Sequence, residues 1–229
     1  MDQHESRSAR IEHRWPAVIA LIVALALYGA LPNDLITVQR YVTVAIGILL
    51  LIPLIVLNPH RFNQQTKWSR IVSLTLAIVV VVSNQITLVS LVFVLIDGHA
   101  KGPSLLQSAL QVWVANVIGF ALLYWEIDRG GPVVRTMAKR SELPPADFRF
   151  PQDEDDDTIV EVAAGSSLKS DWTASFVDYF YFSLSNSMAF SPTDTMPLTA
   201  RTKLLMSLQS FGGFVILALV IARAVSLIG

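Results

Sequence analysis

A few charged and amide side chains stand within or beside otherwise apolar stretches, and they carry most of the chemical potential of this sequence. Asp178 and Arg223 are the two charges of this kind. Five amides accompany them: Asn84, Gln85, Gln111, Asn116 and Asn186. One more acid, Asp194, lies between the last two apolar stretches. Unpaired polar groups are costly in hydrocarbon, so such residues pair with one another or border water and are functional candidates by default.

Asp178 and Arg223 form the most specific candidate pair. Asp178 lies six residues after Trp172, and Arg223 lies six residues before Gly229. In a helix, each charge is therefore about 9 Å from the predicted cytoplasmic end of its stretch. If the last two helices pack antiparallel, the two charges meet, and we predict a structural ion pair. The alternative is that Arg223 extends toward lipid headgroups while Asp178 is protonated or meets water.

The amides have two interpretations. They could hydrogen-bond across helices, at roughly 0.6 kcal/mol per contact, or line a polar cavity or pathway among the third to sixth apolar stretches. Asp194 belongs to the turn-forming segment Ser191-Pro192-Thr193-Asp194. There it most simply caps nearby backbone amides, and a binding role is the alternative.

Enzymatic and metal chemistry have little support in this sequence. It contains no cysteine, and its four histidines lie in the tail or in connectors. No zinc-protease motif or phosphate-binding glycine loop is present. The net charge of −1 gives no field for nucleic acid. We therefore expect no catalytic residues, no cofactor, no metal and no nucleic-acid partner.

Composition indicates that lipid is the solvent of this chain. Hydrophobic residues make up 53% and charged residues only 15%, against about 25% charged residues in soluble domains. Five stretches have the length and apolarity of spanning helices, and a sixth is shorter and more polar; in order they are Trp15–Leu31, Val38–Leu57, Ile71–Ile96, Leu105–Trp125, Thr173–Phe190 and Leu204–Ile228. We predict an all-α fold, a polytopic bundle with six spans.

Basic residues indicate the orientation of these spans. With the N-terminus inside, twelve Lys and Arg residues fall on the cytoplasmic side and four outside. Four tryptophans fall at the predicted cytoplasmic boundary, where indole rings are favoured: Trp15, Trp68, Trp125 and Trp172. Both signals predict that the N-terminus and the C-terminus are cytoplasmic.

The predicted organisation has four parts. Residues 1–14 form a cytoplasmic tail, 15–126 a region of four helices, 127–172 a polar cytoplasmic loop, and 173–229 a helical hairpin with a short polar fifth span, an outer turn and the sixth span. The loop lacks apolar periodicity and is expected to be solvated and partly disordered. Its acidic run 153–157 lacks the spacing of a calcium loop. Binding of a divalent cation or a basic partner by this run is the alternative, and the basic start of the loop could contact anionic headgroups.

Several phrases resemble a family of uncharacterised bacterial multi-pass membrane proteins of the kind frequent in actinobacteria. They are Asn58-Pro59-His60-Arg61, the segment 124–132 (YWEIDRGGP), the segment 147–152 (DFRFPQ), the segment 189–199 (AFSPTDTMPLT) and Ala222-Arg223-Ala224-Val225. This resemblance implies location and architecture, a multi-pass protein of the bacterial plasma membrane, but no chemistry.

A fainter resemblance links the C-terminal third to the pore module of bacterial two-helix potassium channels. The residues that carry it are 181–184 (YFSL), Asp194, 197–201 (PLTAR) and 221–223 (IAR). The five filter positions hold Ala189, Phe190, Ser191, Pro192 and Thr193, without the glycines that a carbonyl filter requires. The basic loop 127–172 also favours the inside, whereas the corresponding loop of those channels is outside. Selective potassium conduction is therefore not expected.

Two functions remain. The first is a structural or regulatory membrane protein that acts through its cytoplasmic loop. The second is a small transporter or channel-like subunit with a polar pathway among helices three to six. The expected partners are the lipid bilayer, further copies of the chain, and a cytoplasmic protein that contacts loop 127–172.

Overall fold

The computed structural model describes residues 12, 15–31, 41, 43–49, 67–97, 102–188 and 195–228. Four long helices make up most of this part of the chain: α1 (Trp15–Gly29), α3 (Lys67–Asp97), α4 (Gly102–Ile127) and α9 (Ala200–Ile228). Three segments are long and apolar enough to cross a membrane: Trp68–Val94, Leu105–Gly130 and Ala200–Arg223. The all-α prediction is confirmed in this coarse form. The predicted span Val38–Leu57 lies mostly outside the described residues.

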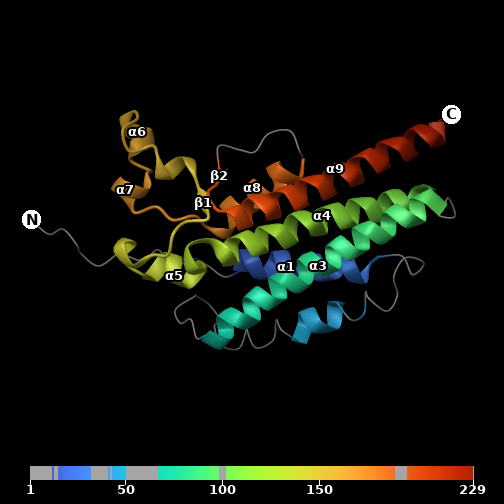
Figure 1. The fold of residues 1–229 in the computed structure, drawn as a ribbon, viewed down its shortest axis with the longest axis horizontal. Helices are drawn as coiled ribbons and strands as arrows, with labels where there is room; N and C mark the ends of the chain where they lie inside the picture. Colours follow the sequence, from blue (N-terminus) through green and yellow to red (C-terminus); the bar gives the residue numbers. More distant parts are fainter. Residues whose placement is uncertain are drawn as a thin grey trace, which may run out of the picture.

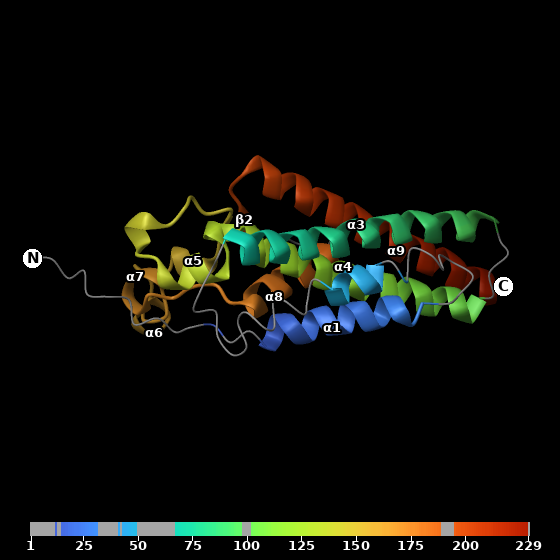
Figure 2. The same cartoon turned by 90° about the horizontal axis from the view of Figure 1, so that it is seen from below.

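Helix α4 is the centre of the bundle. It contacts α1, α3, α8 and α9 (Figures 1 and 2). Its Phe120, Ala121 and Tyr124 are fully buried, and Gly119 lets the α4 backbone lie close to Val80 of α3. Small residues such as Ala109, Ala115 and Ala121 are buried on α4 among its larger side chains, which allows neighbouring helices to approach it.

Residues 128–172 form a folded cap at one end of the bundle (Figure 1). We call this segment the cap and this end the cap end. The cap consists of short elements only, which are η1 (Asp128–Gly130), α5 (Pro132–Met137), η2 (Arg140–Glu142), β1 (Phe148–Arg149), η3 (Pro151–Asp153), α6 (Val160–Ala163) and α7 (Ser167–Ser170). The expectation of a partly disordered loop is not met, because buried charges rather than periodic apolar residues hold these elements together.

Strand β1 of the cap pairs antiparallel with β2 (Met196–Pro197), which immediately precedes α9. Phe148 lies opposite Pro197, and Arg149 opposite Met196. Helix α9 therefore starts at the cap end. Helix α8 (Phe176–Ser187), which follows the cap, also starts there. The chain consequently returns to the cap end between α8 and α9.

Helices α8 and α9 run parallel rather than antiparallel. Asn186 of α8 contacts Met206 and Gln209 of α9, and the next residue, Ser187, lies against Gly213, farther along α9. With 12 residues, α8 is about 18 Å long, well short of the hydrocarbon core of roughly 30 Å. Helix α8 is thus a half-length helix that ends beside the middle of α9. The predicted hairpin, with a short polar fifth span antiparallel to the sixth, is wrong in the direction of its two helices.

This arrangement changes the predicted topology. Helices α1, α3 and α9 all run away from the cap end, and α4 runs back toward it (Figure 1). Trp15 at the start of α1 and Ile228 at the end of α9 therefore lie at opposite ends of the bundle. Six spans with both termini on one side are therefore not confirmed, because α8 has only about half the length of a span.

Candidate functional site around the re-entrant helix

The first turn of α8 is closed by its own side chains. The Oδ2 atom of Asp178 accepts hydrogen bonds from the backbone nitrogen and the hydroxyl of Ser175, both at 2.7 Å. This is a capping box, in which the third residue of the helix, Asp178, accepts from the backbone amide of the N-cap residue, Ser175. Asp178 is therefore a helix cap, which is a role that Ser-x-x-Asp spacing alone can indicate.

The predicted ion pair between Asp178 and Arg223 is wrong. Because α8 and α9 are parallel and both start at the cap end, Asp178 stays at that end. Arg223 lies roughly 34 Å along α9 from Ala200. The prediction assumed an antiparallel hairpin, and the direction of α9 removes its basis.

Glu12 joins the N-terminal region to the start of α8. Its Oε1 atom accepts a hydrogen bond from the backbone nitrogen of Phe176 at 2.5 Å, and both carboxylate oxygens lie 3.1 Å from Nε1 of Trp125. One guanidinium nitrogen of Arg135 lies 3.9 Å from Oε2 of Glu12. Burial raises the pKa of the Glu12 carboxyl above its ordinary value of 4.5, Arg135 offsets part of this effect, and the Asp178 charge adds to it.

We predict that Glu12→Gln flattens the pH dependence of stability. Because the folded pKa of Glu12 is raised, the folded protein binds more protons than the unfolded chain just above pH 4.5, and its free energy of unfolding falls as the pH rises there. Glutamine keeps an acceptor for Phe176 and Trp125 but does not titrate. Thermal unfolding of the detergent-solubilised protein from about pH 4 to about pH 8 measures the effect.

Glu12→Ala is the matched comparison for this prediction. It removes the acceptor as well as the titration, so we expect a loss of about 1–2 kcal/mol at neutral pH that Glu12→Gln does not show. Superimposable pH profiles for the wild type and Glu12→Gln would contradict the assignment.

Asp128 at the end of α4 is fully buried and connects three elements. Its Oδ1 atom accepts hydrogen bonds from the backbone nitrogens of Asp147 and Phe148, at 2.7 and 3.3 Å. Its Oδ2 atom accepts one from the Tyr179 hydroxyl of α8 at 2.5 Å. One carboxylate thus holds the end of α4, the strand β1 and the first turns of α8 together.

Asp147 extends this connection to α9. Its side chain, also fully buried, accepts hydrogen bonds from the Thr199 hydroxyl at 2.7 Å and from the Arg201 guanidinium, with which it forms an ion pair. Its backbone oxygen accepts from the nitrogen of Leu198 at 2.8 Å. We call Asp128 and Asp147 with these contacts the anchor. The anchor fixes the first turn of α9 at the cap end, beside the first turns of α8.

Charged residues also hold the cap itself together. Arg135, which is fully buried, donates to the backbone oxygens of Trp125, Asp128 and Ala174 at 3.0–3.1 Å. Asp153, the first residue of the acidic run, accepts from Arg129 at 2.5 Å and from Ser167 at 2.7 Å. At least this residue of the run is therefore occupied by structural contacts.

The carboxyl half of α8 meets α9 through a buried amide. Gln209 donates from Nε2 to the backbone oxygen and the hydroxyl of Ser183, at 2.9 and 2.6 Å. Its Oε1 atom accepts from Tyr124 and from Asn186, both at 2.8 Å. The candidate Asn186 thus belongs to a contact between α8, α4 and α9, and Gln209 is a central residue that the candidate set lacked.

A second amide cluster joins α1, α3 and α4. Tyr28 donates to Asn84 at 3.1 Å, and Asn84 and Gln85 both donate to Oδ1 of Asn116 at 3.0 Å. Three candidates, Asn84, Gln85 and Asn116, therefore hydrogen-bond to one another between α3 and α4. Gln111 is buried in α4, and its Oε1 atom has no hydrogen-bond partner within the described part of the chain. Asp194 lies outside the described residues.

Two glycines of α9 allow the close packing at the end of α8. A Cβ atom on Gly213 would lie 2.3 Å from the backbone oxygen of Ser187, and one on Gly212 would lie 2.9 Å from Cδ1 of Leu88 in α3. Gly213 thus permits direct backbone contact between α9 and the last turn of α8, in the middle of the bundle.

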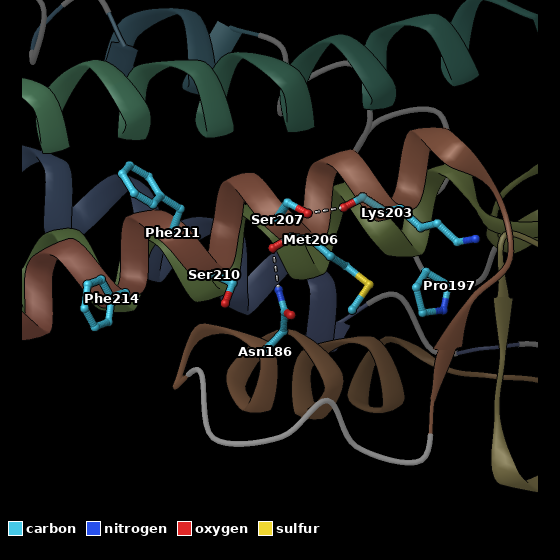
Figure 3. A pocket seen from close by; sticks show the side chains of 8 residues that line it. All are labelled: Asn186, Pro197, Lys203, Met206, Ser207, Ser210, Phe211 and Phe214. Atoms are coloured by element: carbon cyan, nitrogen blue, oxygen red, sulfur yellow. Dashed lines mark hydrogen bonds between the residues drawn. The ribbon is translucent and has the colours of Figure 1, made fainter.

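Two hollows flank the end of α8 along α9. The first, of about 540 Å³, contains polar groups (Figure 3); its lining residues are Asn186, Pro197, Lys203, Met206, Ser207, Ser210, Phe211 and Phe214. The second, of about 500 Å³, is apolar and lies at the end of α8, between α4 and the carboxyl half of α9; Trp113, Ser187 and Ile216 are among its lining residues. Within the described residues, no group of three or more His, Cys, Asp or Glu side chains could hold a metal ion.

Comparison with known proteins gives no relative for this arrangement. No family model, no curated protein and no solved structure matches the chain.

The structure brings some of the predicted site residues together, and it also shows connecting residues that the prediction missed. Asn84, Gln85, Asn116 and Asn186 take part in interhelical contacts. The candidates did not include Glu12, Asp128, Arg135 and Asp147. The two aspartates and Arg129 do occur in distinctive phrases, 124–132 and 147–152, which was the available signal. Their roles depend on contacts between residues far apart in sequence, for which hydropathy gives no evidence.

Proposed function

We propose that this protein is a small channel-like or transporter-like subunit of a membrane, built around the re-entrant helix α8. The observation that carries the proposal is the parallel course of α8 and α9, with α8 ending in the middle of the bundle. A buried half-helix that ends between spanning helices is costly for a purely structural protein, because its last carbonyl groups lack partners in the helix.

The physics of such a helix end favours solute binding. Irregular backbone at membrane depth is tolerated where it is covered by protein or borders water. The carboxyl end of a helix carries a partial negative charge, and broken helices in transporters use such ends to coordinate cations. Cations are therefore the first solutes to test. A glycine-based potassium filter is not part of the proposal, because segment 189–193 (AFSPT) contains no glycine.

The proposed orientation places the cap in the cytoplasm. Ten of the eleven Lys and Arg residues in the described ranges lie at the cap end. Six are in the cap, and four are in the first turns of α3 and α9; they are Arg129, Arg135, Lys139, Arg140, Arg149 and Lys169, and then Lys67, Arg70, Arg201 and Lys203. Arg223 is the eleventh. Trp15 and Trp68 are exposed at the same end. The positive-inside rule supports the cytoplasmic side, and the interfacial preference of tryptophan supports a membrane boundary at this end. The sequence phrases suggest the plasma membrane of a bacterium, crossed several times.

We further propose that the pathway forms between copies of the chain. In one protomer, the polar side chains between α8 and α9 satisfy one another through Gln209, which leaves no continuous polar path among the described residues. A homo-oligomer supplies the additional walls that a pathway requires.

Ion flux into liposomes tests the proposal. We expect purified protein in liposomes to pass a monovalent cation, and Asn186→Leu to reduce this flux at least about tenfold. Asn84→Leu is the matched control, since it removes an equally buried amide from the cluster around α1, α3 and α4, away from α8. It is expected to keep the flux. Flux that is equally low in both variants, with both proteins folded, would contradict a special role for α8.

A structural or regulatory role is the second candidate. One observation favours it, which is that the cap exposes five large apolar side chains: Met137, Ile159, Val160, Val162 and Leu168. Exposed apolar residues on an otherwise polar surface are typical of a contact with another protein. Vesicles that stay tight to every cation and anion tested would make this role the better explanation.

A further inference from the structure

The polar hollow on the outer face of α9 has a graded lining. Lys203, Ser207, Ser210 and Phe214 follow one another at intervals of four, three and four residues, so they share one face of the helix. Lys203 belongs to the first turn, at the cap end, whereas Phe214 lies about 16 Å farther along the axis. The lining therefore changes from charged to hydroxyl to aromatic with increasing depth from the cap end (Figure 3).

Among the described lining residues, the charged end of the hollow has one cation, Lys203. No carboxylate is among its described lining residues. The neighbouring Arg201 is paired with Asp147 of the anchor, and no ion pair to Lys203 is present among the described residues. The Lys203 side chain extends toward the start of α9 (Figure 3), as lysines near helix ends do when they reach the headgroup level. An anion in this end of the hollow would meet Lys203, the cation of the described lining.

The deeper end of the hollow is apolar and open to the side. Phe211 is 68% exposed and Phe214 is 58% exposed. Both belong to Ala200–Arg223, a segment apolar enough to cross a membrane. In a bilayer these rings contact hydrocarbon chains rather than water.

We propose that this hollow is a binding site for one anionic phospholipid. Its headgroup phosphate lies at Lys203 and Ser207, and one acyl chain lies against Phe211 and Phe214. A lone lysine near an anionic membrane surface contributes about 1 kcal/mol, which is enough to select an anionic over a zwitterionic headgroup by severalfold. The inference rests on the membrane location of the chain and not on solute transport.

Lipid-dependent thermal stability tests the site. Detergent-solubilised full-length protein is titrated with phosphatidylglycerol or with phosphatidylcholine of the same chain length. We expect phosphatidylglycerol to raise the unfolding temperature at about fivefold lower concentration, and Lys203→Gln to abolish this difference. Lys139→Gln is the matched control, because Lys139 is exposed on the cap and away from the hollow. It is expected to keep the difference.

Two further arms separate lipid from other occupants. Inorganic phosphate alone is expected to give no shift, and Phe214→Ala is expected to weaken the effects of both lipids. A phosphate effect equal to that of phosphatidylglycerol, or a headgroup preference that survives Lys203→Gln, would overturn the proposal. The chain has no cysteine, so Ser210→Cys gives one unique thiol. Efficient disulfide formation between two Cys-bearing protomers in a bilayer would show that a second copy occupies this face instead.

Discussion

Asp128→Ala is expected to lower the free energy of unfolding by about 3–5 kcal/mol and to release the cap from the bundle. The alanine would leave the buried backbone nitrogen of Asp147 and the Tyr179 hydroxyl without their acceptor. Each unsatisfied buried donor costs about 1–3 kcal/mol. Arg129, whose Nε lies 3.8 Å from the Asp128 carboxylate, would also lose a neutralising neighbour.

Limited proteolysis of the cap measures this effect, together with thermal unfolding. Cleavage within residues 138–172 is expected to accelerate strongly in Asp128→Ala. Asp128→Asn retains an acceptor for the two backbone nitrogens, so its stability and its cleavage rate should lie between those of Asp128→Ala and the wild type. Asp157→Ala removes an exposed acid of the same cap and is expected to change stability by less than about 0.5 kcal/mol. Equal resistance of Asp128→Ala and Asp157→Ala would show that the anchor does not hold the cap.

The long helices could be predicted from sequence because each apolar stretch satisfies its own backbone. The predicted stretch Ile71–Ile96 lies within α3, Leu105–Trp125 within α4, and Leu204–Ile228 within α9. The boundaries differ by a few residues, since the polar ends of a helix have no hydropathy signal. For example, α9 begins at Ala200, before its first long apolar side chain.

The direction of α8 relative to α9 could not be predicted in the same way. Hydropathy gives the length of a segment but not whether the chain crosses or returns. The return depends on Asp147, whose partners Thr199 and Arg201 are more than fifty residues away in sequence. Trp125 illustrates the same limit, because it was expected at the lipid interface and instead is buried with its indole nitrogen bonded to Glu12.

Gly213→Ala is expected to displace the end of α8 and to destabilise the protein by about 2–3 kcal/mol. The new Cβ atom would lie 2.3 Å from the backbone oxygen of Ser187 and 3.2 Å from its carbonyl carbon. A backbone atom cannot turn aside as a side chain can, so α8 or α9 has to move. In an open helix interior the same exchange would instead stabilise by up to about 1 kcal/mol, which makes the sign of the effect diagnostic.

Gly212→Ala is the matched control for this prediction, because it changes the adjacent residue of the same helix. Its Cβ atom would meet Cδ1 of Leu88 at 2.9 Å, the end of a flexible side chain that can rotate. We expect a loss of less than about 1 kcal/mol there. Thermal unfolding compares the two variants, and the liposome assay shows whether the displaced helix end also stops solute flux. A Gly213→Ala protein at least as stable as Gly212→Ala would mean that α8 does not end against α9, and the re-entrant arrangement would then lose its main support.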